Sequence, residues 1–397
     1  MKIFIVGAGG QGGPCASVLA RDPAVSRIVL GDLDPSAAAR VREKIGSPKI
    51  QTEQVDARSE RSLAKAAEGA DVVIDLVLPE FGEHVMRAAL EAGAHYVNTA
   101  FYQPFFDQFY KGEPLFLDQE FRDAGLTAVL GCGMAPGFLN VVTRLYADKL
   151  DRVESIRLRL AKKKLGAEEM VTPYNPGWSP KQALLDCAED VYVLEDGKLR
   201  ILGAYSGLER YAFPEPLGEM LVSHHAHEEP LSMPRFIGKG LRYCDFKYYV
   251  APQPAAFIHA GLASEEPVEV NGALVKPLDL LVKLLPKSGN AFLEEDASKY
   301  EELDRLSHVC MMIEMEGEKD GVKRHYRVHL PKMTANGAKL RELFGTALIN
   351  VALPAVIGAK MAVAGCQKGV ISSECLDPHD FLDRFLGTGI PYKWKEL

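Results

Sequence analysis

The sequence predicts an α/β fold, in which a Rossmann doubly wound parallel sheet is joined to a second α+β domain with a mixed or antiparallel sheet. Three observations support this prediction. The 397 residues exceed what one compact core usually holds. The first 130 residues alternate short apolar runs with amphipathic runs, as the strands and helices of a parallel sheet do. After residue 150, single apolar and polar residues alternate, which is typical of half-buried strands.

The first part of the chain supplies the predicted parallel sheet. Pro35 suits the first turn of a helix, and Gly69 follows a helical pattern as a C-terminal stop. We expect strands at 2–6, 27–31, 50–56, 71–79, 95–101 and 126–131, and helices at 10–21, 35–45, 60–69, 81–92 and 114–124.

The second part of the chain supplies the other sheet. Residues 153–161 alternate apolar and polar side chains, as a half-buried strand does. Residues 191–202 read as a hairpin around Asp196-Gly197, and residues 307–330 as a hairpin around a turn at 317–321. The last long helical pattern runs from about 334 to 366.

Composition excludes several classes of protein. The net charge is −8 and no cluster of Lys and Arg forms a basic face, so we expect no nucleic-acid partner. The seven cysteines are odd in number and form no CxxC pair, which indicates reduced thiols. No signal peptide is recognisable, and no apolar run approaches the roughly 20 residues that span a bilayer. We therefore expect a cytoplasmic protein without a membrane partner.

The stretch "GAGGQG" at 7–12 matches the dinucleotide fingerprint G-x-G-x-x-G between a predicted strand and a predicted helix. Gly7 allows the tight turn, Gly9 lets a pyrophosphate approach the backbone, and Gly12 lets the helix pack closely on the strand. Asp32 lies twenty residues after Gly12, where a carboxylate binds ribose hydroxyls and repels a 2′-phosphate. No arginine follows it immediately, so we predict NAD over NADP.

Residues that follow the other strands should line the same crevice, because parallel strands end at one edge of the sheet. This adds positions near the adenine and near the nicotinamide ribose. The predicted cofactor-binding residues are Gly7, Gly9, Gly10, Gln11, Gly12, Asp32, Leu33, Asp56, Ala57, Leu78, Pro79, Asn98 and Thr99.

Several stretches carry a resemblance to a known family. They are "GAGGQG", "HYVNTAF", "GCGMAPGFLN", "DRVESIRLRL", "PYNPGWSPKQALLDCAEDVYVLEDGKL", "VEVNGALVKPLDLL" and "QKGVISSECLDPHDFL". With these the chain resembles the saccharopine dehydrogenase-like family, most closely its lysine 6-dehydrogenase branch. The resemblance implies a split Rossmann domain (1–135 with about 345–397) and an inserted domain (136–344) that binds substrate and forms a homodimer.

The family implies hydride transfer between a nicotinamide and a carbon that bears nitrogen. The resemblance favours NAD-dependent oxidative deamination of an amino acid, as in lysine 6-dehydrogenase, because Ala135 stands where saccharopine reductases carry an acidic residue. Formation or cleavage of a secondary amine, as with saccharopine, is the alternative. Lys162, Lys163 and Lys164 replace a Gly-Gly pair of the relatives, and Lys163 could bind a second carboxylate. A non-catalytic NAD-binding regulator is a third hypothesis.

The stretch "HHAHEEP" at 224–230 aligns with the segment that contacts substrate in the family. We predict His225 as a proton acceptor, because imidazole titrates near neutral pH, and Glu228 as an ammonium partner. A solvated turn is the alternative for both. We expect no metal, because the histidines are spaced i, i+1, i+3 and no distant cysteine completes a zinc site.

Four further residues are candidates for the substrate pocket. Arg235 could pair with the α-carboxylate of an amino acid, or be a surface arginine. Cys132 could line the nicotinamide pocket, or be a buried packing residue. Tyr102 and Trp178 could cover the aliphatic chain of the substrate, or belong to the core.

Overall fold

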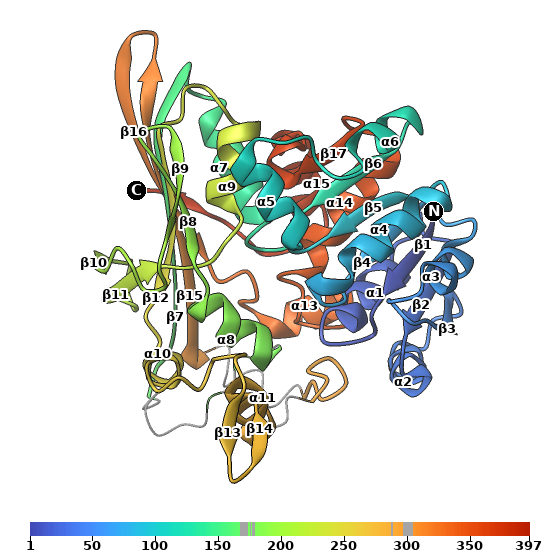
Figure 1. Ribbon diagram of the computed structural model, residues 1–397. Coiled ribbons are helices and arrows are strands. Elements are labelled where there is room, and N and C mark those ends of the chain that lie inside the picture. The colour runs from blue at the N-terminus through green and yellow to red at the C-terminus, as the bar shows by residue number, and fades with distance from the viewer. Residues whose placement is uncertain (167–173, 175, 177–178, 287–288, 297–304) are drawn as a thin grey trace.

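The computed structural model describes the chain except residues 167–173, 175, 177–178, 287–288, 297–304 and the side chain of Gln103. Two sheets lie on opposite sides of a central layer of helices (Figure 1). The strands of the first sheet are β1 (Lys2–Val6), β2 (Arg27–Asp32), β3 (Ile50–Gln54), β4 (Val72–Asp75), β5 (His95–Asn98), β6 (Thr127–Leu130) and β17 (Gly369–Ser372).

All neighbours in this sheet pair in parallel, in the order β17-β6-β5-β4-β1-β2-β3. The chain reverses its direction of travel across the sheet between β1 and β4. Ligands of open α/β sheets bind at such a switch point, outside the carboxyl ends of the strands. The predicted doubly wound sheet is therefore confirmed.

Apolar side chains on both faces of the first sheet explain why it is covered by helices on both sides. In β1, Ile3 and Ile5 belong to one buried cluster and Phe4 and Val6 to the other, because successive side chains of a strand point to opposite faces. The first cluster is covered by α1 (Gly12–Ala20), α2 (Pro35–Ile45) and α14 (Ala352–Gly365). The second is covered by α3 (Glu60–Ala67), α4 (Gly82–Glu91), α5 (Gln103–Lys111) and α6 (Asp118–Asp123).

The second sheet is mixed, as predicted. Its main path is β10-β11-β12-β7-β15-β16-β18, and β8 and β9 attach at β12. Only β12 and β7 pair in parallel along this path. Its strands are β7 (Arg152–Lys164), β8 (Val191–Glu195), β9 (Lys198–Leu202), β10 (Glu209–Ala212), β11 (Glu219–His224), β12 (Tyr243–Tyr249), β15 (Ser307–Lys319), β16 (Val322–Pro331) and β18 (Lys395–Glu396).

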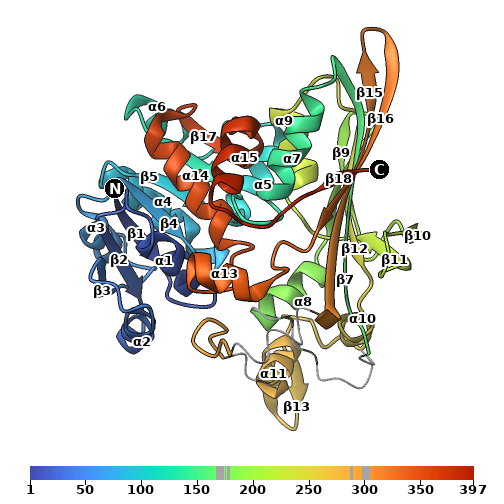
Figure 2. The same ribbon diagram turned by 180° about the vertical axis from the view of Figure 1, so that it is seen from behind.

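The remaining elements complete the middle layer and one end of the molecule. They are α7 (Phe138–Ala147), α8 (Pro180–Ala188), α9 (Glu229–Phe236), α10 (Pro252–His259), α11 (Pro277–Leu284), α13 (Gly337–Phe344), α15 (Pro378–Gly387), the hairpin β13 (Val268–Val270) and β14 (Ala273–Val275), and the short 3-10 helices η1 (Pro79–Phe81) and η2 (Ser373–Cys375). Helices α7, α14 and α15 lie between the two sheets (Figures 1 and 2).

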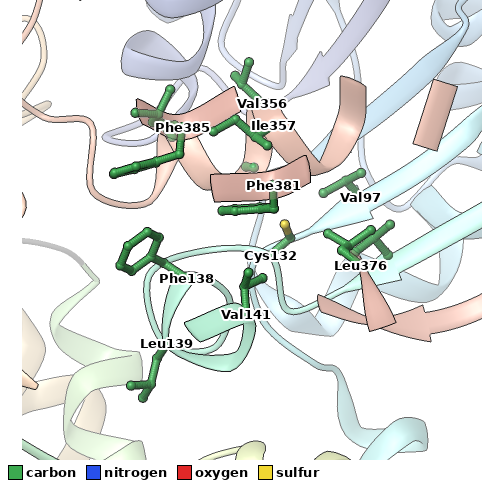
Figure 3. Close-up of a cluster of buried hydrophobic side chains, with 14 of the residues drawn as sticks. Val97, Cys132, Phe138, Leu139, Val141, Val356, Ile357, Leu376, Phe381 and Phe385 are labelled. Carbon is green, nitrogen blue, oxygen red and sulfur yellow. The ribbon is translucent and has the colours of Figure 1, made fainter. Parts of the chain in front are cut away.

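Helices and sheets share one continuous core. Phe138 of α7 packs against Phe385 of α15, with ring centroids 4.7 Å apart. Figure 3 shows both rings among buried residues of α14 and of the first sheet. Ile156 and Leu158 of β7 belong to the same buried cluster as Ile3 and Ile5 of β1. The core therefore joins the second sheet to the first and fixes their relative positions.

Several predicted boundaries were wrong. The strand expected at 71–79 ends at Asp75, because Pro79 begins the short helix η1. The helix expected at 114–124 starts only at Asp118, and α5 was not predicted. The turn expected at 317–321 is formed by Asp320 and Gly321, while Gly317 lies inside β15 at a register shift, where a side chain would meet the Arg152 backbone. The pattern at 334–366 forms two helices, α13 and α14.

The end of the chain returns to both sheets. Strand β17 pairs with β6 in the first sheet, whereas β18 pairs with β16 in the second. The predicted boundaries of the two domains remain predictions. Strand β18 pairs in the second sheet, although residues 345–397 were expected to belong to the Rossmann domain. Among the helices of the described residues, none combines the length and the apolar character needed to cross a bilayer.

Candidate active site

The loop between β1 and α1 has the geometry that its glycines predict. Gly7 has a φ of +101°, a conformation that favours glycine. A Cβ added at Gly12 would lie 1.9 Å from the carbonyl oxygen of Gly7, so only glycine allows α1 to start this close to β1. The roles assigned to these two glycines from the fingerprint match their positions.

The same loop leaves room for a dinucleotide. Gly9 and Gly10 are exposed, and a Cβ added at either would meet no atom within 4 Å. The Oε1 atom of Gln11 is buried and has no hydrogen-bond partner among the described residues. Open backbone N–H groups at a helix N-terminus fit the pyrophosphate of a nicotinamide dinucleotide, whereas Oε1 of Gln11 is an acceptor that suits a donor such as a hydroxyl group.

Asp32 holds this loop from the end of β2. Its Oδ2 accepts a hydrogen bond from the Ala8 N–H at 2.7 Å, and its Oδ1 accepts one from the Asp34 N–H at 2.9 Å. The carboxylate is partly exposed, and the next residue, Leu33, is 58% exposed. The structure therefore places Asp32 beside the glycine-rich loop, as the fingerprint predicts.

The residues after β3 and β4 also lie at the carboxyl edge. Asp56 forms a bidentate pair with Arg58 at 2.9 and 2.8 Å, and this guanidinium lowers the Asp56 pKa to about 2. Sequence reasoning missed Arg58, a cation two residues after a predicted cofactor ligand. Ala57 is half-buried, and after β4, Leu78 is exposed and Pro79 half-buried.

Asp75, which sequence reasoning missed, ends β4 at the switch point. It is buried and accepts hydrogen bonds from the Tyr96 hydroxyl at 2.8 Å and the Val77 N–H at 3.2 Å. Burial raises its pKa to about 7. Asn98 donates to the Tyr96 hydroxyl at 3.2 Å and accepts from the Gly131 N–H at 2.8 Å, so it ties β5 to the loop after β6. A small cavity here is lined by Asp75, Val77, Pro79, Gly82, Asn98, Thr99, Ala100 and Tyr102.

The start of α9 lies against the residues that follow β5. Glu228 is buried, and its Oε1 accepts a hydrogen bond at 3.0 Å from the N–H of Phe101, which follows β5. Glu229 is fully buried, and its Oε2 lies 2.5 Å from Nδ1 of His227. The Phe101–Glu228 bond brings this part of the inserted segment against the carboxyl edge of the first sheet.

His227, which directly precedes Glu228 and Glu229, is the positively charged residue of this segment. Burial opposes its charge, but the carboxylates of Glu229 and Glu228 outweigh that effect and raise its pKa to about 9. The ring also stacks on Phe246, with centroids 3.8 Å apart. Because the pKa is raised, this ion pair stabilises the fold fully below pH 6.5, and its contribution is lost as the pH rises through about 9.

His225 has the opposite character. Burial lowers its pKa to about 3, and the charges of His227 and Lys162 act in the same direction. It stacks on Tyr248, with centroids 5.1 Å apart. A neutral imidazole with so low a pKa accepts a proton poorly. The two pKa shifts therefore favour His227 over His225 as the group that titrates near neutral or alkaline pH.

The lysine that lies near His225 is Lys162. In β7, Ile156, Leu158 and Leu160 belong to the core between the sheets, and Ala161 to the cluster on the outer face. Successive side chains alternate, so Lys162 shares the inner face and Lys163 the outer one. Lys163 is exposed and pairs across the strands with His308. Lys162 rather than Lys163 is therefore the lysine whose charge acts on His225, and the role predicted for Lys163 remains a prediction.

Asp186 of α8 adds a third carboxylate, which the sequence did not reveal. Its Oδ1 accepts a hydrogen bond from Gln182 Nε2 at 2.7 Å. Burial raises its pKa to about 7, and the charges of His227 and Glu228 also act on it. Burial likewise raises the pKa of Glu228. Burial therefore makes the ionised form of both carboxyl groups less favourable than it is in water.

His227, Glu228 and Glu229 bring possible metal-ligand atoms within 4.8 Å of one another. The carboxylates raise the pKa of His227, which favours an imidazolium paired with Glu229 and Glu228 over a neutral imidazole. We therefore describe this trio, together with Asp186, as the acidic cluster.

The predicted substrate residues are not brought together. Arg235 is exposed in the last turn of α9 and donates to the Glu113 carbonyl at 2.7 Å. It lies seven positions after Glu228, which corresponds to a helical rise of roughly 10 Å. Cys132 is fully buried with its Sγ 3.4 Å from the Pro354 carbonyl, in the core drawn in Figure 3, and burial raises its pKa to about 12.

Tyr102 is 3% exposed and packs on Gly82 and Phe105, although its ring also borders the small cavity next to Thr99. Trp178 lies outside the described residues. The structure thus brings Glu228 against the residue that follows β5, and it groups His225, His227, Glu229, Asp186 and Lys162 around Glu228. The predicted cofactor-binding positions lie along the carboxyl edge of the first sheet.

Family models match almost the whole chain. The model for the saccharopine dehydrogenase NADP binding domain matches residues 3–129, and the model for the saccharopine dehydrogenase C-terminal domain matches residues 133–390.

Two curated relatives are similar over the full chain. Carboxyaminopropylagmatine dehydrogenase of Synechocystis sp. is 28% identical, and the alignment covers 100% of this chain and 97% of that protein. Carboxynorspermidine synthase of Vibrio cholerae is 25% identical with the same coverage.

Solved structures share the fold. Saccharopine dehydrogenase (L-Glu forming) from Saccharomyces cerevisiae superimposes with a TM-score of 0.69 at 16% identity, over 100% of this chain and 99% of that one. Homospermidine synthase from Legionella pneumophila in complex with NAD gives a TM-score of 0.62 at 13% identity, over 100% and 91%.

Proposed function

The chain belongs to the saccharopine dehydrogenase family, and on that premise we propose that it forms or cleaves a secondary amine between a cationic amine and a carboxylate-bearing carbonyl compound. Family members are NAD(P)-dependent oxidoreductases that act on amine compounds, and this chain is one of them. The observation that carries the finer proposal is the acidic cluster, which lies against the carboxyl edge of the first sheet through the Phe101–Glu228 bond.

The acidic cluster suits a substrate with more than one positive charge. Glu228 and Asp186 have raised pKa values because burial removes water without supplying enough positive charge. The Oε1 atom of Glu229 is buried and has no hydrogen-bond partner among the described residues. An ammonium or guanidinium group would satisfy these oxygens. The names of the two relatives denote carboxylated derivatives of agmatine and norspermidine, which are amines of this kind.

Lys162 suits the other end of such a substrate. It lies on the inner face of β7, and its charge acts on His225. An ammonium there attracts the carboxylate of the carbonyl compound, as the sequence predicted for its neighbour Lys163. A negative end at Lys162 and a positive end at the acidic cluster would orient the reacting carbon between them.

The chemistry needs a proton and a hydride. An amine and a carbonyl compound lose water to give an iminium, whose carbon accepts the hydride and becomes the carbon of the secondary amine. Bound NAD(P)H supplies that hydride from C4 of the nicotinamide. His227 donates the proton to the departing hydroxyl, Glu229 holds the imidazolium in place, and Glu228 and Asp186 hold the cationic end of the amine.

We propose NAD as the preferred cofactor, as the sequence predicts. The carboxylate of Asp32 beside the Ala8 N–H suits ribose hydroxyls and repels a 2′-phosphate. Arg58 is the cation that could favour NADP instead, but its guanidinium is paired with Asp56.

Deamination of lysine, as in lysine 6-dehydrogenase, is the second candidate, and Ala135 is the residue that favours it. The raised pKa values of Glu228 and Asp186 favour a substrate with more positive charge than lysine, which also carries a carboxylate.

A substrate panel tests the proposal. Oxidation of NADH and of NADPH is followed at 340 nm with agmatine, norspermidine or butylamine, each combined with carboxylate-bearing aldehydes and 2-oxo acids. We expect kcat/KM to be at least about tenfold higher for agmatine or norspermidine than for butylamine, since a charged hydrogen bond contributes about 1.5–3 kcal/mol. We also expect a lower KM for NADH than for NADPH.

In the reverse direction, reduction of NAD is followed with lysine and with saccharopine. Turnover of lysine alone would support the second candidate, and turnover of saccharopine alone would contradict a site for cations. A lower KM for NADPH would show that the interpretation of Asp32 is wrong.

A further inference from the structure

A short piece of the inserted segment, residues 289–296, lies against the dinucleotide loop although it is far away in sequence. We call it the latch segment. Nδ2 of Asn290 donates a hydrogen bond at 3.0 Å to the carbonyl oxygen of Ala8, inside the glycine-rich loop. In Figure 2 the latch segment appears between α2 and α11, towards the lower end of the molecule.

Three further contacts anchor the latch segment to α1, to α2 and to the connection between α13 and α14. The ring of Phe292 is 1% exposed and occupies the space where Gly13 of α1 lacks a side chain; a Cβ there would lie 2.4 Å from the ring. Nζ of Lys44 in α2 donates to the carbonyls of Phe292 and Leu293. The Glu295 carboxylate accepts from the Thr346 hydroxyl at 2.6 Å and the Ala347 N–H at 2.8 Å.

The Ala8 peptide groups are held from two sides. Asp32 accepts from the N–H of Ala8, and Asn290 donates to its C=O, which forms the peptide group with the Gly9 N–H. A Cβ added at Gly9 or Gly10 would meet no atom of the described residues within 4 Å, and glycine loses more conformational freedom on ordering than any other residue. The direction of the Gly9 N–H therefore depends on the group that holds the Ala8 carbonyl.

We propose that Asn290 is a positioning residue for the dinucleotide: by fixing the Ala8 carbonyl, it directs the backbone N–H groups of the glycine-rich loop toward the pyrophosphate. The latch segment thereby makes cofactor affinity depend on the inserted, substrate-binding part of the chain. This inference rests on the nicotinamide dinucleotide of the proposed function, but not on the identity of the amine.

Asn290 also has a local structural role, and one substitution separates the two. Its Oδ1 accepts hydrogen bonds from the N–H groups of Phe292 and Leu293, which shape the turn. Asn290→Asp keeps this acceptor and removes the donor to Ala8. Asn290→Ala removes both and adds no charge. A raised Kd in both variants would therefore indicate loss of the donor, because Asn290→Ala introduces no carboxylate that could repel the pyrophosphate.

The test is the Kd for NADH, measured by calorimetry on the full chain, together with the unfolding midpoint without cofactor. Loss of one hydrogen bond to a neutral carbonyl predicts a roughly three- to tenfold higher Kd in both variants, with the midpoint preserved in Asn290→Asp. We expect a smaller increase for Lys44→Met, which loosens the latch segment. Lys49→Met is the matched control, since its amine also donates to a backbone carbonyl, that of Asp22, away from the latch segment.

A wild-type Kd for NADH in Asn290→Asp would overturn the proposal, as would a lowered midpoint with unchanged Kd in Asn290→Ala. The titration needs no amine. Protein that shows the Asn290 effects but turns over no amine would therefore contradict the proposed function and leave the role of Asn290 standing.

Discussion

Replacement of His227 by glutamine is expected to lower kcat by about 10²- to 10⁴-fold, the usual contribution of a positioned acid or base. The wild-type imidazolium has a pKa raised to about 9 by Glu229 and Glu228 against the effect of burial, so it can donate a proton at neutral pH. Glutamine keeps a polar group of similar size but cannot ionise. The measurement is the pH profile of kcat/KM for reductive formation of the secondary amine.

The pH profile separates a catalytic role from a structural one. We expect wild-type activity to fall as the pH rises through about 9, and we expect this limb to be absent in His227→Gln. His225→Gln is the matched control, because His225 has a pKa of about 3 and does not titrate in this range. A limb near pH 9 that persists in His227→Gln but disappears in His225→Gln would restore His225 as the proton carrier.

Replacement of Gly12 by alanine is expected to weaken NADH binding by more than about 100-fold. The added Cβ would lie 1.9 Å from the carbonyl oxygen of Gly7, and backbone atoms cannot move aside as a flexible side chain can. Helix α1 must then shift away from β1, and its N-terminal N–H groups lose their position at the pyrophosphate. Calorimetric titration with NADH measures the effect.

Two other glycines serve as controls. Gly203→Ala adds its methyl group in open space at the end of β9, and its Kd for NADH should equal that of the wild type. Gly10→Ala also adds a methyl group in open space, but on the loop itself, so it should fold normally and bind NADH more weakly. Wild-type affinity in both Gly12→Ala and Gly10→Ala would contradict the assignment of this loop to the dinucleotide.

Local patterns were sufficient to predict most of the first sheet. The glycine-rich loop, and the helix that begins at Pro35 and stops before Gly46, follow from rules that act within a few residues. Helix α5 was missed because its aromatic residues directly follow a strand and read as a continuation of an apolar run. The break between α13 and α14 was missed because both helices are apolar on the side that faces the core.

The site was predicted less completely, because it depends on contacts between distant segments. Alternation along β7 was evident, but not which face was inward, so Lys163 was chosen instead of Lys162. Asp186 belongs to no recognisable sequence motif. It lies near His227 only because α8 packs at this position in the folded protein. The sequence could not distinguish His225 from His227, because the difference arises only in the folded protein. Burial lowers the pKa of His225, whereas Glu229 raises the pKa of His227. The homodimer and the cytoplasmic location remain predictions.

Transfer of deuterium from NADH to product tests the central claim most directly. The protein is incubated with agmatine or norspermidine, a carboxylate-bearing aldehyde, and NADH labelled with deuterium at either the pro-R or the pro-S position of C4. Hydride transfer predicts one deuterium on the carbon bonded to the new secondary nitrogen, from one of the two labelled cofactors only, as detected by mass spectrometry. Tight binding of NADH without deuterium in any amine product would contradict the account and indicate a non-catalytic NAD-binding protein.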